Sequence, residues 1–274
     1  MSIYQVDAFA AEPFTGNPGG VCLLREPLKD EIMAKIAAEM NLSETAFVHP
    51  LAKQSFQKAT VFSLRWFTPK VEVSLCGHAT LATAAVLFRE VKVNTNELEF
   101  RTKSGSLRAK ESQAGIHLFL PADDPIEILP PRQLLRTLGV KDFIDIQYGS
   151  KTRSLLVCLP REEDVHSLSP DYKQMESSET QRGVEGVIVT AQGSHRYDFI
   201  SRFFAPWMGI NEDPVTGAAH TVLAPYWSRI LGKMEMKAYQ ASARGGELTV
   251  RLGSGNTVEL IGNAVVVLKG ELMI

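Results

Sequence analysis

The chain has 274 residues, 45% of them hydrophobic and 22% charged, a composition typical of a folded globular protein rather than a disordered one. Its 29 basic and 31 acidic residues give a net charge of −2, so the charge balance does not favour nucleic acid as a partner. The longest purely apolar runs, such as 84–88 and 264–268, have five residues, whereas a transmembrane helix needs roughly 20, so no membrane partner is expected.

Residues that alternate in polarity, or that are β-branched and aromatic, predict strands in the first half of the chain. In chain order these strands are 3–8, 44–49, 58–66, 97–101, 106–110 and 115–120. Apolar residues at helical spacing predict a helix over 29–40 that stops at Asn41. The glycine-rich segment 14–21 is interpreted as a loop. Residues 77–89 are apolar or small almost all round, which predicts a helix buried on every side.

The second half of the chain repeats the first. The run RWFTP that starts at Arg65 returns as RFFAP at Arg202, offset by 137 positions. A glycine- and alanine-rich segment follows each copy, and two weaker matches keep the same order. We therefore predict an α+β fold of two pseudo-symmetric lobes, 1–118 and 119–263. Each lobe is a curved, barrel-like, mostly antiparallel sheet around a central helix, and the second helix lies near 217–231.

Both predicted central helices start at a glycine, Gly77 and Gly217. A helix N-terminus has unpaired N–H groups and a partial positive charge, so two such termini suit a small anion, most simply a carboxylate. The alternative interpretation is that these glycines only serve tight turns.

Three ionisable residues are candidates for chemistry near these helix starts. Glu44 lies between a helix end and an apolar run, where burial is expected to raise its pKa toward that of a general base, unless it is a surface residue. His78, in the first turn of its helix, is expected to be neutral, and is either a proton relay or a packed group. Asp213 is either a helix cap or a polar group of the site. The amide of Asn17 could reach a ligand or only fix a turn.

The sequence lacks the patterns of several other chemistries. Three scattered cysteines form no CxxC pair, and no closely spaced His, Cys and Asp cluster indicates a metal site. No phosphate-binding or dinucleotide-binding glycine motif is present, and no lysine stands in a context that marks a Schiff base, so no cofactor is expected. The N-terminus shows no signal peptide, which predicts a cytoplasmic protein.

Four motifs together resemble the phenazine-biosynthesis PhzF-like family over almost the whole chain. They are DAF…FTGNP from Asp7, NLSETAFV from Asn41, RWFTPKVEVSLCGHATLATA from Arg65 and FFAPWMGINEDPVTGAAH from Phe203. The resemblance implies the diaminopimelate epimerase-like fold, an active site in the cleft between the lobes, and a homodimer. In such folds the last strand commonly returns to the first lobe, so residues 264–274 are expected there.

The resemblance also implies a cofactor-independent isomerase that shifts a proton between carbons of a small, carboxylate-bearing, dihydrohydroxyanthranilate-like metabolite. By motif, Glu44 is the proton shuttle, and His78 and Asp213 are its catalytic partners. Asn17, Gly77, Gly217 and Ala218 are the matching substrate-binding positions. Ala218 stands where the best-understood isomerase has serine, which removes one hydroxyl from the site.

Two alternatives remain open from the sequence. The first is an amino-acid racemase or epimerase that uses Glu44 with His78 or Cys76. Related epimerases use one cysteine from each lobe, and here the second lobe has no counterpart of Cys76 at its helix start. The second alternative is a metabolite-binding or interaction protein that keeps the fold without turnover.

Overall fold

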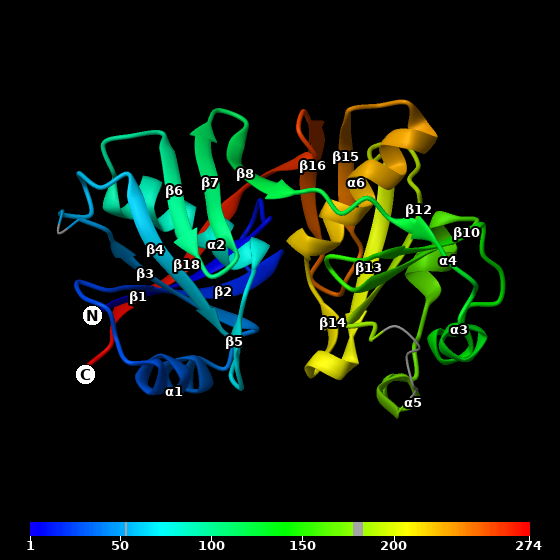
Figure 1. Ribbon diagram of the computed structural model, residues 1–274, viewed down its shortest axis with the longest axis horizontal. Helices are drawn as coiled ribbons and strands as arrows, with labels where there is room; N and C mark the ends of the chain where they lie inside the picture. The colour runs from blue at the N-terminus through cyan, green and yellow to red at the C-terminus, as the bar shows by residue number, and fades with distance from the viewer. Residues whose placement is uncertain (53, 178–182) are drawn as a thin grey trace. The chain divides into compact units, whose positions relative to one another are not determined.

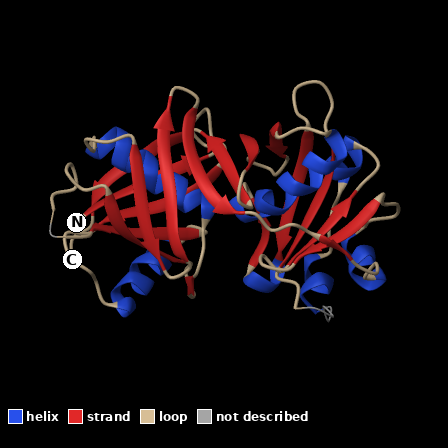
Figure 2. Ribbon diagram, turned by 45° about the horizontal axis from the view of Figure 1, so that its top comes forward, coloured by secondary structure: helices blue, strands red, loops and turns tan. Residues whose placement is uncertain are grey.

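The computed structural model describes residues 1–52, 54–177 and 183–274, which form two compact units (Figure 1). Unit 1 comprises Met1–Leu120 and Glu259–Ile274, and unit 2 comprises Pro121–Val258. The boundaries therefore fall at 120/121 and 258/259, where the sequence analysis expected 118/119 and 263/264. In each unit, strands curve around one long helix (Figure 2).

Unit 1 is built from strands that are mostly antiparallel. The antiparallel pairs are β18–β1, β1–β2, β3–β4, β4–β5, β6–β7 and β7–β8, and the parallel pairs are β2–β3 and β4–β6. These strands are β1 (Ser2–Ala8), β2 (Asn17–Leu23), β3 (Glu44–Pro50), β4 (Val61–Phe67), β5 (Glu72–Val73), β6 (Glu97–Thr102), β7 (Gly105–Ser112), β8 (Gly115–Pro121) and β18 (Ala264–Glu271). β17 (Thr257–Gly262) pairs with β8. The strand at the C-terminal end of the chain thus lies beside the first, with Ser2 opposite Glu271 and Ala8 opposite Ala264.

The central helix of unit 1 is α2 (Gly77–Ala85), and all nine of its residues are buried. Burying the hydroxyl groups of its two threonines without partners would cost free energy. Thr80 and Thr83 avoid this cost because they donate hydrogen bonds to the carbonyls of Cys76 and Ala79, each four residues earlier. The sequence analysis continued this α-helix to residue 89, whereas the chain turns π-helical over η1 (Val86–Val91).

The prediction of a loop over 14–21 was wrong, because Asn17–Leu23 forms strand β2. One of its two glycines lies where a larger residue would crowd the neighbouring strand. A Cβ on Gly20 would lie 2.8 Å from Oγ1 of Thr45 on the neighbouring β3. The glycine-rich composition of this segment favours a loop, and its strand conformation is explained only by its pairing with neighbouring strands.

Helix α1 (Asp30–Met40) confirms the helix predicted over 29–40. It ends at Asn41, which adopts the left-handed conformation with φ 49°. Met33, Ile36 and Ala37 pack against Phe47 and Phe67 of the adjacent strands. The helix end thereby fixes where the chain enters β3, whose first residue is Glu44.

Unit 2 repeats the pairing order of unit 1. Within β10 to β16 the antiparallel pairs are β10–β11, β12–β13, β13–β14 and β15–β16, and the parallel pairs are β11–β12 and β13–β15, so these strands correspond to β1 to β7. In addition, β9 pairs antiparallel with β10. The strands are β9 (Ile126–Glu127), β10 (Asp145–Gly149), β11 (Ser154–Cys158), β12 (Gly186–Gln192), β13 (Phe199–Ala205), β14 (Ile210–Asp213), β15 (Glu235–Gln240) and β16 (Gly246–Gly253). The helices are α3 (Arg132–Leu138), α4 (Glu162–Ser167), α5 (Tyr172–Ser177), the 3₁₀ turn η2 (Pro206–Met208) and α6 (Gly217–Leu231).

Helix α6 matches the helix predicted near 217–231 and contains a proline in its interior. Pro225 has no N–H group, so the carbonyl of Thr221 loses its usual helical partner. The N–H of Asp123 donates to that carbonyl instead, at 3.1 Å. Among the described residues, no helix is long and apolar enough to cross a membrane.

Candidate functional site

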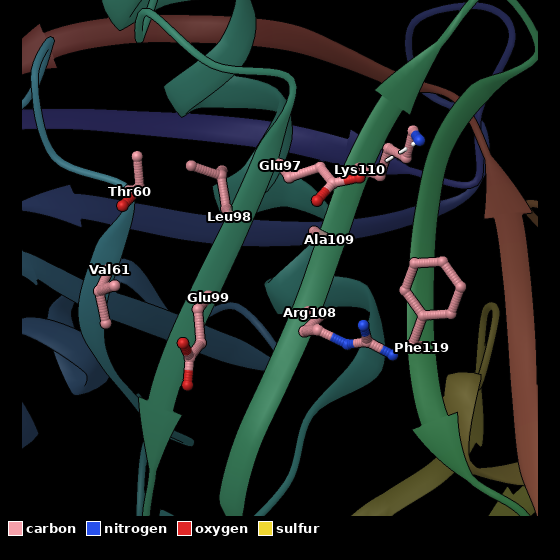
Figure 3. Close-up of a pocket in the computed structure, with 9 residues that line it drawn as sticks. All are labelled: Thr60, Val61, Glu97, Leu98, Glu99, Arg108, Ala109, Lys110 and Phe119. Carbon is pink, nitrogen blue, oxygen red and sulfur yellow. Dashed lines mark ion pairs between the residues drawn. The ribbon is translucent and has the colours of Figure 1, made fainter. Parts of the chain in front are cut away.

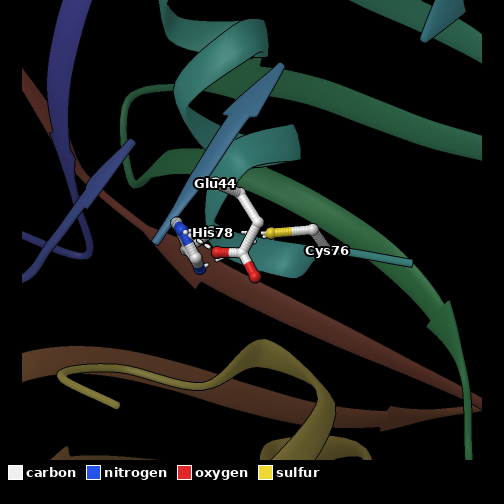
Figure 4. Close-up of side chains that lie close together, drawn as sticks. All are labelled: Glu44, Cys76 and His78. Carbon is white, nitrogen blue, oxygen red and sulfur yellow. Dashed lines mark hydrogen bonds and ion pairs between the residues drawn. The ribbon is translucent and has the colours of Figure 1, made fainter. Parts of the chain in front are cut away.

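In unit 1, the start of β3 and the start of α2 bring Glu44 beside His78 (Figure 4). Oε2 of Glu44 lies 3.2 Å from Nε2 of His78, and the two side chains are only 12% and 5% exposed. The parallel pairing of β2 with β3, and the packing of α2 against both strands, place these residues together although 34 positions separate them. The structure therefore joins two of the three predicted catalytic residues in one buried ion pair.

Cys76 completes a compact group with this pair. It is the residue before α2, and its Sγ lies 3.6 Å from Nδ1 and 3.9 Å from Nε2 of His78. One ligand atom from each of Glu44, Cys76 and His78 lies within 4.8 Å of the others. The sequence analysis considered Cys76 as a base of the racemase alternative, and the structure places its sulfur against the imidazole.

Two further side chains contact the ring of His78. Oγ of Ser43 lies 3.3 Å from Nε2, and the amide nitrogen of Asn17 lies 3.1 Å from Nδ1. A protonated ring needs an acceptor at Nδ1, which the Asn17 amide supplies when it is turned about its Cβ–Cγ bond. Asn17, predicted to bind substrate, thus lies in the same cluster, whereas Ser43 was missed.

The protonation states of Glu44 and His78 differ from those expected from the sequence, a raised carboxyl pKa and a neutral imidazole. Burial raises the pKa of Glu44, but the charge of His78, together with polar contacts from His78, Ser43 and Cys76, outweighs burial and holds that pKa below its ordinary value. Burial lowers the pKa of His78, but the Cys76 sulfur and the Glu44 carboxylate raise it well above 6.5. A helix terminus contributes about 0.3–1 kcal/mol, whereas an opposite charge this close shifts a pKa by about 1–3, equivalent to roughly 1.4–4 kcal/mol. The predicted neutral imidazole and raised carboxyl pKa were therefore wrong.

The resting protonation states follow from these directions. Glu44 is a carboxylate, His78 an imidazolium, and Cys76 a thiol, because burial raises the pKa of Cys76 to about 11. A carboxylate is the form of Glu44 that can accept a proton.

In unit 2, Asp213 ends β14 and is held by a buried network before α6. Its Oδ2 accepts a hydrogen bond of 2.5 Å from Oγ1 of Thr216, the residue that precedes the helix. Gln240 of β15 donates to the Asp213 carbonyl and to Oγ1 of Thr216, and accepts from the N–H of Thr216 at 2.8 Å. The N-cap position of α6 is Thr216 rather than Asp213. Thr216 was not singled out although it lies within the motif that starts at Phe203, and Gln240 was missed because it lies outside the four motifs.

The starts of the two central helices are built alike. The residues before Gly77 and Gly217, Cys76 and Thr216, make no side-chain cap hydrogen bond. Gly77 and Gly217 are both buried. The residue after each glycine is His78 in unit 1 and the half-buried Ala218 in unit 2, so the repeat supplies one imidazole at this position.

A bidentate ion pair supports the segment before each central helix. Arg65 of β4 binds both carboxylate oxygens of Glu72 on β5, at 2.7 and 2.8 Å. Arg202 of β13 binds Glu212 on β14 in the same way, at 2.7 and 2.9 Å. Glu212 directly precedes Asp213, so this pair helps to fix the backbone of a predicted site residue. The repeated Arg-x-Phe pattern was the available sequence signal for both pairs.

A surface hollow of about 350 Å³ in unit 1 contains none of the predicted site residues (Figure 3). An ion pair between Lys110 and Glu97, 3.2 Å long, lies along it. The lining residues are Thr60, Val61, Glu97, Leu98, Glu99, Arg108, Ala109, Lys110 and Phe119. Its lining contains no cysteine or histidine, and its lysine is paired with a glutamate, so we assign no chemistry to it.

Comparison with known proteins matches residues 6–270 to the family described as phenazine biosynthesis-like protein, PhzC-PhzF. A phenazine biosynthesis-like domain-containing protein of Bos taurus is 44% identical, over 99% of this chain and 99% of that protein. A protein of Pseudomonas aeruginosa named an uncharacterized isomerase is 46% identical, over 99% of this chain and 98% of that protein. The solved structure of a PhzF-family phenazine biosynthesis protein from Enterococcus faecalis is 41% identical with a TM-score of 0.88, covering 100% and 99% of the two chains.

A hydroxyproline epimerase from Agrobacterium vitis is only 11% identical but has a TM-score of 0.55, covering 98% of this chain and 91% of that one, so it shares the fold. Together with the Enterococcus faecalis structure, this likeness confirms the predicted α+β, diaminopimelate epimerase-like fold.

Replacing Glu44 by glutamine should lower the pKa of His78 by at least about 1, because the opposing carboxylate charge is lost. Because folding raises the pKa of His78 above 6.5, its protonated form stabilises the fold fully below about pH 6.5, and this contribution is lost as the pH rises through the folded-state value. Histidine side-chain NMR across a pH series measures the change. Glu97→Gln, at an exposed position of β6, is the control, and an unchanged pKa of His78 in Glu44→Gln would contradict the ion pair.

Gln240→Leu should lower the free energy of unfolding by at least about 2 kcal/mol, because it leaves Thr216 N–H and the Asp213 carbonyl buried without their partner. Urea denaturation measures the loss. Gln133→Leu, at an exposed position of α3, should change it by less than about 0.5 kcal/mol. Equal effects of the two substitutions would show that the network around Asp213 contributes nothing.

Proposed function

This chain belongs to the phenazine biosynthesis-like PhzC-PhzF family, and from that premise we propose that it is an isomerase with Glu44 as its acid–base group. The reaction shifts a proton between two carbons of a small carboxylate-bearing substrate, with dihydrohydroxyanthranilate as the family's example. One observation carries the proposal: a buried carboxylate whose ionised form is maintained by the imidazolium of His78. The Pseudomonas aeruginosa relative named an isomerase agrees with this class of reaction.

In the proposed step, Glu44 removes a proton from a substrate carbon, and the electron pair of the broken C–H bond enters the conjugated system of the substrate. The protonated Glu44 then returns the proton to a second carbon, which restores the carboxylate. No electron leaves the substrate, so the balance needs no redox partner. His78 is assigned to binding and polarising a polar group of the substrate, and the N–H groups at Gly77 to its carboxylate. The substrate-facing roles of Asp213 and Gly217 stay predictions from the family resemblance. Asn17 orients His78 through the Nδ1 contact of 3.1 Å.

The ion pair sets the strength of the base. While Nε2 of His78 lies 3.2 Å from Oε2 of Glu44, the pKa of Glu44 stays low and the carboxylate is a weak base. A substrate oxygen that accepts from Nε2 would draw the imidazolium charge away, and burial would then raise the pKa of Glu44. In this way the bound substrate itself would strengthen the base that acts on it.

The spacing of the group favours transfer on one face of the substrate over a two-base racemase. Two bases on opposite sides of a carbon must each lie about 3–3.5 Å from it, which separates them by roughly 6–7 Å. The candidate atoms of Glu44, Cys76 and His78 lie within 4.8 Å of one another, too close to hold a carbon between them. A single carboxylate that removes and returns the proton fits this spacing.

Incubation with dihydrohydroxyanthranilate in deuterated water tests the assignment, with proton NMR following the exchange at carbon. We expect Glu44→Gln to slow this exchange by about 10²–10⁴-fold, because an amide cannot accept the proton. The control Glu97→Gln, at an exposed position of β6, should keep the wild-type rate. Wild-type exchange in Glu44→Gln would contradict the role of Glu44, and affinity without exchange in the unaltered protein would favour the binding-protein alternative.

A further inference from the structure

Three side chains that differ in ligand type converge at the start of α2. Nε2 of His78 lies 3.2 Å from Oε2 of Glu44 and 3.9 Å from Sγ of Cys76, and all three ligand atoms lie within 4.8 Å of one another. In a tetrahedral zinc site, bonds of about 2.0–2.3 Å place neighbouring ligand atoms about 3.3–3.7 Å apart. The distances from Nε2 of His78 to the other two ligand atoms are thus already close to those in a metal site.

The carboxylate offers an atom without a hydrogen-bond donor. Oε2 of Glu44 is buried and accepts no hydrogen bond, although Nε2 of His78 lies 3.2 Å away as an ion-pair partner. A cation bound between the three side chains would satisfy Oε2 directly.

The surroundings of His78 suit a metal-binding imidazole. When Nε2 binds a cation, the proton remains on Nδ1 and needs an acceptor. The amide of Asn17, 3.1 Å from Nδ1, supplies one when its oxygen faces the ring. Ser43 keeps a partner of its own, because its hydroxyl lies 3.3 Å from the carbonyl of Pro18.

From this geometry we propose that Glu44, Cys76 and His78 form a site for one thiophilic divalent cation of the Zn²⁺ class. The sulfur ligand selects such ions over Mg²⁺ and Ca²⁺, which prefer oxygen alone. Binding releases one proton from the Cys76 thiol and one from the His78 imidazolium, and leaves a fourth position for water or a substrate oxygen. The site goes beyond the proposed reaction, and its occupation withdraws Glu44 from proton transfer, so the cation is an inhibitor.

The sequence analysis expected no metal because no ligand set stands at a known spacing. Cys76 and His78 are two positions apart, but Glu44 lies 32 positions before Cys76. It joins them only because β2 pairs with β3 and α2 packs against both strands. The inference therefore depends on the fold and not on a motif.

Titration of the metal-free, full-length protein with Co²⁺ tests the site, because a cobalt–thiolate bond gives a near-ultraviolet charge-transfer band. We expect one equivalent of Co²⁺ to produce the band and Zn²⁺ to abolish it. Cys76→Ser should remove the band, and Glu44→Gln or His78→Gln should weaken Co²⁺ binding at least about 100-fold. Cys22→Ser and Cys158→Ser are matched controls, since both are buried free cysteines outside the cluster, and both should retain the band.

Three results would overturn the proposal: no band in the unaltered protein, a band that persists in Cys76→Ser, or a band lost in Cys158→Ser. Circular dichroism of each metal-free variant checks that the loss does not come from unfolding. The assay contains no substrate, so it is independent of the proposed reaction. A band with no Glu44-dependent exchange contradicts only the reaction, and exchange with no band contradicts only the metal site.

Discussion

Placing a carboxylate in a largely apolar interior is expensive, and at Glu44 the charge of His78 offsets that cost at a distance of 3.2 Å. The surrounding structure keeps the two groups in place. Asn41 ends α1 and sets the entry to β3, and the glycines of β2 let that strand pack closely against β3. Because α2 is buried on all sides, His78 at its start is held among strands rather than in water. The proposed chemistry, and the proposed cation site, both depend on this one pair.

The internal repeat supplies two similar scaffolds with different polar groups. Strand order and pairing direction agree between β1 to β7 and β10 to β16, and each unit contains an Arg–Glu pair before its central helix. At the helix starts, however, Gly77 is followed by His78 and Gly217 by Ala218. Thr80 and His220 occupy matching positions in the two helices, and the side chain of each donates a hydrogen bond to the carbonyl four residues earlier. His220 therefore bonds to the backbone of its own helix, and we do not assign it to a second imidazole site. Duplication has kept the backbone arrangement while the chemistry became asymmetric.

Local patterns were sufficient for the helices over 30–40 and 217–231 and for most strands of unit 1, and the four motifs identified the fold. They were insufficient wherever a distant partner decides the outcome. Strand β2 contains glycines that resemble a loop until β3 packs beside it, and η1 follows an α-helix with no sequence break. The predicted protonation state of His78 was wrong for the same reason. The sequence shows that His78 lies at a helix start, but it does not show that a carboxylate 34 positions away lies beside the ring.

A double-mutant cycle on Glu44→Gln and His78→Gln, followed by urea denaturation at pH 6, measures the central interaction most directly. At this pH the lowered pKa of Glu44 keeps it ionised and the raised pKa of His78 keeps it protonated. The account predicts that the effects on the free energy of unfolding are coupled by about 1–3 kcal/mol. Additive effects, within about 0.3 kcal/mol, would show that the two side chains are neighbours without being an ion pair.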